Sequence, residues 1–96
     1  VNGDQNFFKK MIQLFVDDTP GLIDNIESAL VQNDSKTISE IAHRLKPSLD
    51  HLSKSSMQKM VRDVEAAKGD DQSTKKLVDD FCQQLHQLIT ELKEEL

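Results

Sequence analysis

The sequence predicts an all-α domain, and three observations lead to this class. Apolar residues recur at the helical spacing of three or four along nearly the whole chain. Only 3 Gly and 2 Pro occur among 96 residues, which is too few for the turns of an all-β domain of this length. Charged residues make up 30% of the chain, which suits solvated helix surfaces. We therefore expect an antiparallel up-down-up-down four-helix bundle with an additional N-terminal helix.

The first third of the chain carries two apolar stripes, over residues 7–15 and 22–30. Thr19 and Pro20 lie between them. Threonine is a common N-cap residue, and proline is favoured at the first position of a helix. We therefore expect one helix to end before Thr19 and a second to begin at Pro20. The earlier of the two is the additional N-terminal helix, which would cover one end or edge of the bundle.

Three more apolar stripes follow, and each is predicted to form one helix of the bundle. Short polar segments separate the stripes, so neighbouring helices are expected to run antiparallel. The last helix is the longest, at roughly 33 Å. The stripes span residues 38–52, 57–67 and 77–92, with a cap at Asp34 or Ser35, a turn at 53–56, a stop at Gly69 and a polar loop at 70–73.

Composition and charge exclude several classes of function. The formal net charge is −5, and the chain has no Trp and no Tyr, which argues against a general binder of nucleic acid or anionic membranes. A single Cys excludes an intramolecular disulfide and a cysteine zinc cluster, and it fits a reducing compartment. No segment is long and apolar enough to cross a membrane. We expect one cytoplasmic domain over residues 1–96, without membrane contact and without a cofactor or metal of its own.

His43 is the residue that points to a function. Its helical phase lies about 160° from the centre of the 38–52 stripe, so the side chain should face solvent. Lys46 lies one turn on, exposed and within reach. Pro47 removes the helical hydrogen bond to the carbonyl of His43, which costs about 3 kcal/mol. A lone exposed His is most often an ordinary surface residue, and only the combination of the three is informative.

Residues 42–48 read Ala-His-Arg-Leu-Lys-Pro-Ser. This segment resembles the His-x-Leu-Lys-Gly-Ser signature of histidine-containing phosphotransfer (HPt) domains, with Pro47 in place of the usual Gly. The resemblance extends over essentially the whole chain. It includes Asn2-Gly3-Asp4, Phe7-Phe8, Leu14-Phe15, Pro20, the Asn33-Asp34 turn and Val64-Glu65.

The resemblance implies a phosphorelay intermediate that passes a phosphoryl group between Asp residues of response-regulator receiver domains. His43 would carry the group on Nε2, Lys46 would stabilise its charge, and Glu65 would orient the imidazole. The chain would be a phosphocarrier and not an enzyme, because the partner receiver supplies the Mg²⁺ and the transfer chemistry. Residues implied in partner binding are Ser39, Glu40, Arg44, Pro47 and Asp50.

Charge and context add further expectations. Residues 35–68 carry seven cations and four anions, a net charge of +3 against −8 for the remainder, and such asymmetry can steer an acidic partner. The domain is expected to be a monomer. The chain starts at Val1, inside what resembles the family's entry motif, so we expect that residues lie upstream of it and that it is a fragment of a longer hybrid sensor kinase.

Two alternative functions remain open at this point. One is the dimerisation and phosphoacceptor hairpin of a sensor kinase, whose His-Glu-Leu-Arg-Thr-Pro motif is superficially similar; Arg44 has the wrong charge for it. The other is a helical interaction domain without phosphorylation. Cys82 and His86 have the spacing of a metal-ligand pair, but two ligands alone are usually incidental.

Overall fold

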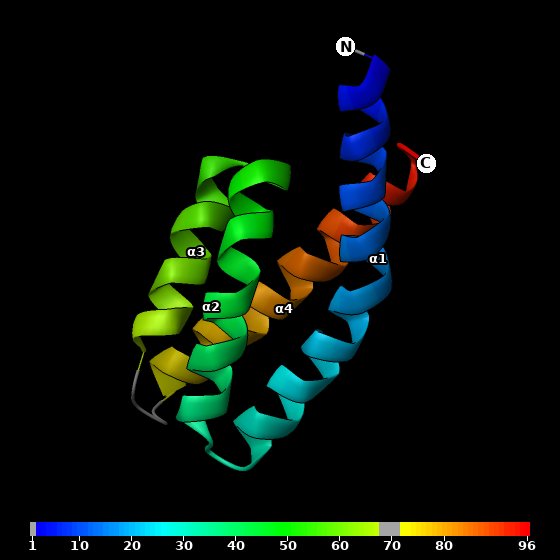
Figure 1. Ribbon diagram of the computed structural model, residues 1–96. Helices are drawn as coiled ribbons and strands as arrows, with labels where there is room; N and C mark the ends of the chain where they lie inside the picture. The colour runs from blue at the N-terminus through cyan, green and yellow to red at the C-terminus, as the bar shows by residue number, and fades with distance from the viewer. Residues whose placement is uncertain (1, 68–71) are drawn as a thin grey trace.

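A computed structural model describes residues 2–67 and 72–96, with side chains from Asn6 onward, and over these residues it contains four α-helices and no strand. In Figure 1, α1 runs down from the N-terminus, α2 returns upward, α3 descends beside α2, and α4 rises obliquely behind them. The predicted stop at Gly69 lies outside the described residues. The helices are α1 (Asn2–Val31), α2 (Ser35–Leu52), α3 (Ser55–Ala66) and α4 (Gln72–Lys93).

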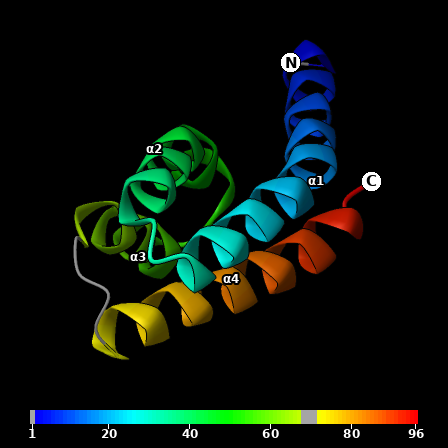
Figure 2. The same ribbon diagram turned by 90° about the horizontal axis from the view of Figure 1, so that it is seen from below.

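The helices form two layers. Figure 2 shows α1 and α4 side by side in one layer, and α2 and α3 side by side in the other. Between the layers, α1 packs on α2 and α3 packs on α4, so that among the described residues each helix contacts two neighbours. This closed ring of contacts is that of a four-helix bundle.

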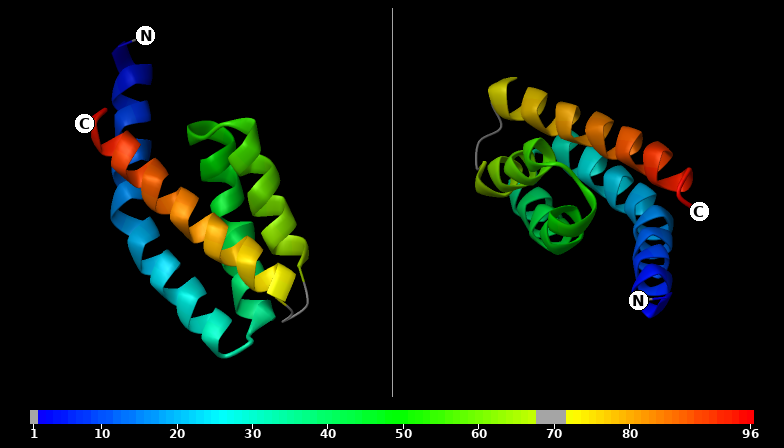
Figure 3. Two further views of the ribbon diagram at one scale, coloured as in Figure 1. Left: turned by 180° about the vertical axis from the view of Figure 1, so that it is seen from behind. Right: turned by 90° about the horizontal axis from the view of Figure 1, so that it is seen from above.

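The predicted break at Thr19–Pro20 is wrong, because α1 continues through Pro20 as one 30-residue helix. Residues 2–31 of the described chain therefore form one helix, without the separate N-terminal helix that was expected. Thr19 is buried inside the helix instead of capping one. Ile12 and Ile23, on either side of the proline, are both fully buried, so a continuous helix keeps both halves of α1 in the core. Pro20 has no N–H to donate within the helix, and Figures 2 and 3 show α1 bending in this region.

The N-terminal part of α1 extends past the core. The predicted apolar stripe begins at Phe7, but Phe7 and Phe8 are 65% and 46% exposed, and Leu14 is 63% exposed. Burial starts at Ile12. From above, the N-terminal end of α1 projects away from α2 and α3 (Figure 3).

The core between the layers is made almost entirely of aliphatic side chains and two Phe residues. The predicted stripes of α2, α3 and α4 supply most of it, and Phe81 of α4 is fully buried. Close packing of such side chains gives a rigid frame for the helix surfaces. Its buried apolar members are Ile12, Phe15, Val16, Ile23, Ile26, Ala29, Ile38, Ala42, Leu45, Leu49, Leu52, Met57, Val61, Val64, Val78, Phe81, Cys82, Leu85, Ile89 and Leu92.

Polar side chains fix both ends of α2. Asp34 caps the N-terminus, as the sequence predicted: its carboxylate accepts hydrogen bonds from the Thr37 backbone N–H at 3.2 Å and from the Thr37 hydroxyl at 2.6 Å. These bonds hold the pKa of Asp34 below its usual value. At the C-terminus the Ser53 hydroxyl donates to the Leu49 carbonyl at 2.6 Å. The helix that carries His43 therefore has defined ends.

No helix in the described part of the chain has both the length and the apolar character needed to cross a membrane.

Candidate functional site

His43 lies on the outward face of α2, in the phase that the sequence predicted. Its side chain is 71% exposed. Nδ1 lies 2.6 Å from Oε2 of Glu65, which belongs to α3. Nδ1 is thus held by the protein, and among the described residues no hydrogen bond is found for Nε2.

The contact with Glu65 sets the chemistry of the imidazole. A carboxylate only accepts hydrogen bonds, so the neutral ring donates its Nδ1–H to Glu65 and keeps the lone pair on Nε2. Glu65 is suited to this because its pKa is lowered, first by the hydrogen bond from Lys46 and then by that of His43, against the opposing effect of partial burial. The arrangement prepares Nε2 as a nucleophile.

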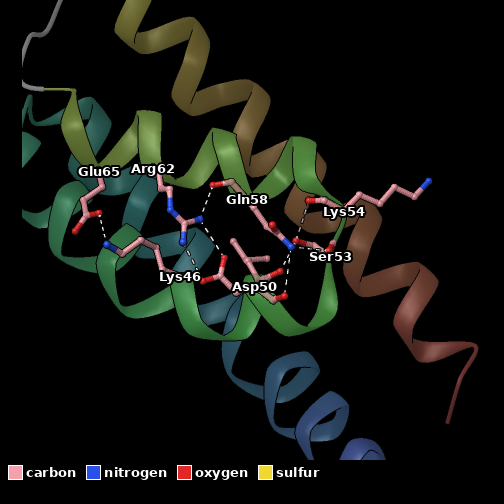
Figure 4. Close-up of polar contacts among 8 residues, drawn as sticks. Lys46, Asp50, Ser53, Lys54, Gln58, Arg62 and Glu65 are labelled. Carbon is pink, nitrogen blue, oxygen red and sulfur yellow. Dashed lines mark hydrogen bonds and ion pairs between the residues drawn. The ribbon is translucent and has the colours of Figure 1, made fainter.

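Lys46 shares the same carboxylate. Its Nζ lies 2.8 Å from Oε1 of Glu65, and the two side chains are 26% and 25% exposed. Figure 4 shows Lys46 reaching from α2 toward Glu65 on α3. Lys46 is therefore partly buried and paired, whereas its helical phase predicted an exposed side chain. Glu65 joins the two α2 residues through its two oxygens.

A second group of contacts links α2 to α3 beside Glu65 (Figure 4). The Arg62 guanidinium donates to both oxygens of Asp50, at 3.0 and 2.9 Å, and to the Gln58 carbonyl at 2.9 Å. The Gln58 amide donates to the carbonyls of Asp50 at 3.3 Å and Ser53 at 3.1 Å. We call Ser39, His43, Lys46, Asp50, Gln58, Arg62 and Glu65 together the cross-helix network.

The residues expected to bind a partner fall into two groups. Glu40, Arg44 and Pro47 are exposed, and Arg44 lines a hollow between α1 and α2. Ser39 and Asp50 instead use their polar groups within the protein: the Ser39 hydroxyl donates to the Glu65 carbonyl at 2.8 Å, and Asp50 is paired with Arg62. Sequence reasoning did not single out Arg62 or Gln58, because only the packing of α3 on α2 brings them to Asp50.

Ion pairs neutralise several of the cations in residues 35–68, the segment predicted to carry net positive charge. Lys46, Lys59 and Arg62 are each paired with a carboxylate, of Glu65, Asp63 and Asp50 respectively. Within the described part of residues 35–68, the cations without such a pair are Lys36, Arg44 and Lys54. Of these, Arg44 directly follows His43.

No group of three or more potential ligands is placed to hold a metal among the described residues. Cys82 is buried, and burial raises the pKa of its thiol to about 12. His86 and His51 are exposed. Cys82 is accordingly a core residue and not a reactive thiol.

The Hpt domain family matches residues 10–95 of the chain. The chain belongs to the Hpt domain family. Comparisons with curated proteins and with solved structures gave no match. Hpt domains are phosphocarriers of two-component signalling and interact with response-regulator receiver domains. The Hpt match favours this class over the sensor-kinase hairpin that the motif superficially resembles.

Proposed function

We propose that this Hpt domain is a phosphorelay intermediate that accepts a phosphoryl group on Nε2 of His43 and passes it to an Asp of a receiver domain. The exposed His43 ring with Nδ1 held by Glu65 is the observation that carries the proposal. It leaves one nitrogen of defined tautomer open to an approaching partner. The family match supplies the class of reaction.

The proposed transfer is an in-line displacement. The lone pair of Nε2 attacks the phosphorus of a receiver aspartyl phosphate. The N–P bond forms, the P–O bond to the aspartate breaks, and its electron pair remains on the carboxylate. Nδ1 keeps its proton, so the phosphorylated ring gains positive charge, which the Glu65 carboxylate stabilises at 2.6 Å. Donation to a receiver Asp is the reverse of this step.

Lys46 enters the proposal as the cation for the phosphoryl oxygens. In the unphosphorylated protein its amino group is paired with Glu65. A phosphoryl group on His43 brings a dianionic competitor one helical turn from Lys46, and ammonium pairs well with phosphate. We propose that Lys46 then contacts both anions.

The partners proposed are receiver domains, with Mg²⁺ and the acidic pocket on the partner's side. The surface offered to them includes Glu40, Arg44 and Pro47 around His43, all exposed. Arg44 supplies an unpaired positive charge there, which complements an acidic pocket. Pro47, where the family signature has Gly, has no long projecting side chain, so the approach to His43 is kept. The domain is proposed to act as a monomer.

Incubation with an acetyl-phosphate-charged receiver domain and Mg²⁺ tests this function. The wild type should acquire acid-labile phosphate, and His43→Gln should acquire none. His51→Gln is the matched control, because His51 is an exposed histidine on the same helix, and it should be labelled like the wild type. Absence of label on the wild type, or label on His43→Gln, refutes the proposal.

A further inference from the structure

Glu65 lies between two sets of contacts that join α3 to α2. On one side, the Ser39 hydroxyl donates to the Glu65 backbone carbonyl at 2.8 Å. On the other side, Arg62 is three residues before Glu65, on the same face of α3. Arg62 grips Asp50 of α2 through two parallel hydrogen bonds of 3.0 and 2.9 Å. The residue that holds His43 is thus bracketed by cross-helix contacts.

Hydrogen bonds that involve Gln58 support the Arg62–Asp50 pair (Figure 4). The guanidinium donates to the Gln58 carbonyl one turn earlier in α3, at 2.9 Å. The Gln58 amide in turn donates to main-chain carbonyls of α2 and its C-cap, those of Asp50 and Ser53. Donors on α3 therefore meet acceptors on α2 at several points, and the planar guanidinium fixes direction as well as distance.

The ion pair between Arg62 and Asp50 should contribute little to the free energy of folding. The side chains of Arg62 and Asp50 are 50% and 40% exposed, and exposed ion pairs contribute little to folding. They are well placed to fix the register of the two helices. A slide of α3 by one residue is a shift of about 1.5 Å, which is enough to break a 2.6 Å contact between Glu65 and His43.

We propose that Arg62 and Asp50 are a positioning pair, which sets the register of α3 on α2 so that Glu65 reaches His43 and Lys46 at once. The inference rests on the proposed function of His43 and adds residues that act through Glu65. Each partner favours the charged form of the other: the Arg62 hydrogen bonds lower the pKa of Asp50, and Asp50 raises the pKa of Arg62. Both groups are therefore charged near neutral pH.

Arg62→Gln tests the pair, with Lys59→Gln as the matched control. Lys59 is also a cation of α3 paired with a carboxylate, but its partner Asp63 lies on the same helix, so its loss leaves the register unchanged. Two properties of the 96-residue chain are measured: the tautomer of His43 by ¹⁵N NMR, and the rate of phosphoryl uptake from a charged receiver domain. Circular dichroism melting checks that each variant is folded.

In the wild type and Lys59→Gln, the Nδ1–H tautomer of His43 should predominate. In Arg62→Gln, the Nε2–H tautomer should gain population, and uptake should slow about tenfold, as for a small misplacement near a reacting group. Arg62→Lys keeps the positive charge but replaces the planar guanidinium with a single ammonium group. It should therefore recover part of the rate.

A wild-type tautomer and rate in Arg62→Gln would overturn the inference, whether or not the melting temperature changes. An equal loss in Lys59→Gln would also overturn it, because the effect would then be one of charge. If the wild type takes up no phosphate, the proposed function fails, while the NMR measurement still decides whether Arg62 positions Glu65.

Discussion

The two helices of each layer are held together by a different kind of contact. Between α1 and α4, the contact includes fully buried apolar side chains such as those of Ile23 and Phe81. Between α2 and α3, the cross-helix network adds directional contacts over an apolar interface. The residue proposed to react lies in the second layer.

Apolar and polar contacts specify different properties of a helix pair. Apolar burial is strong but non-directional, so by itself it does not specify which polar groups of two helices meet. Hydrogen bonds to charged groups are weaker at an exposed site, but they are lost over fractions of an ångström. Both layers contribute buried apolar side chains to the core, and the α2–α3 layer adds polar contacts that set the geometry around His43.

Phe81→Ala should have the largest effect on stability. The ring is fully buried at the centre of α4, and truncating such a residue costs about 3–5 kcal/mol. Urea unfolding measures it, and Gln84→Ala on the exposed face of α4 is the control. In the molecules that remain folded, the His43 tautomer should be that of the wild type. A loss below about 1 kcal/mol would show that α4 is not the apolar support described.

Glu65→Ala should slow phosphoryl uptake strongly and affect stability less than Phe81→Ala does. The variant loses the only described partner of His43 Nδ1, so phosphoryl uptake should slow about tenfold to a hundredfold, as when a histidine loses its orienting carboxylate. The urea midpoint should change less than in Phe81→Ala, because Glu65 is partly exposed and contributes ion pairs rather than buried apolar area. Glu65→Gln should lie between the two, since an amide oxygen still accepts from Nδ1–H. Asp63→Ala, an exposed acid two residues earlier, is the control. Equal uptake by Glu65→Ala and wild type would remove Glu65 from the site.

Acidification should produce the smallest and most gradual effect, concentrated in the α2–α3 layer. Hydrogen bonds lower the pKa of Asp50 and Glu65 below the ordinary values of 3.8 and 4.5. Their stabilising contribution is complete above those ordinary values and is lost as the pH falls through the lowered folded-state values. The urea midpoint should therefore fall below about pH 4.5, and less so in an Asp50→Asn, Glu65→Gln variant. An identical acid response in both proteins would count against the network.

Much of this architecture follows from the sequence because helical periodicity is a local signal. The stripes of α2, α3 and α4 gave the buried faces, and the phase of His43 gave its exposure. The prediction of helix boundaries was wrong at Pro20. Thr19–Pro20 has the form of a helix start, and only the burial of Ile12 and Ile23 on one helix shows that the chain passes through it.

The site was predictable in part for the same reason. His43 and Lys46 are neighbours on one helix, so their spacing places them together. The resemblance implied that Glu65 lies beside His43. In the structure, Oε2 of Glu65 lies 2.6 Å from Nδ1 of His43. The roles of Ser39, Asp50 and Arg62 depend on the register between two helices, which no periodicity within either helix encodes.

Pro47 changes the main-chain hydrogen bonding of the turn that carries His43. Proline has no N–H, so the carbonyl of His43 lacks the donor that residue i+4 supplies in a regular helix. The same turn is joined to α3 by the contacts of His43 and Lys46 with Glu65. The orientation of the imidazole therefore depends on a carboxylate of the neighbouring helix as well as on the main chain of α2.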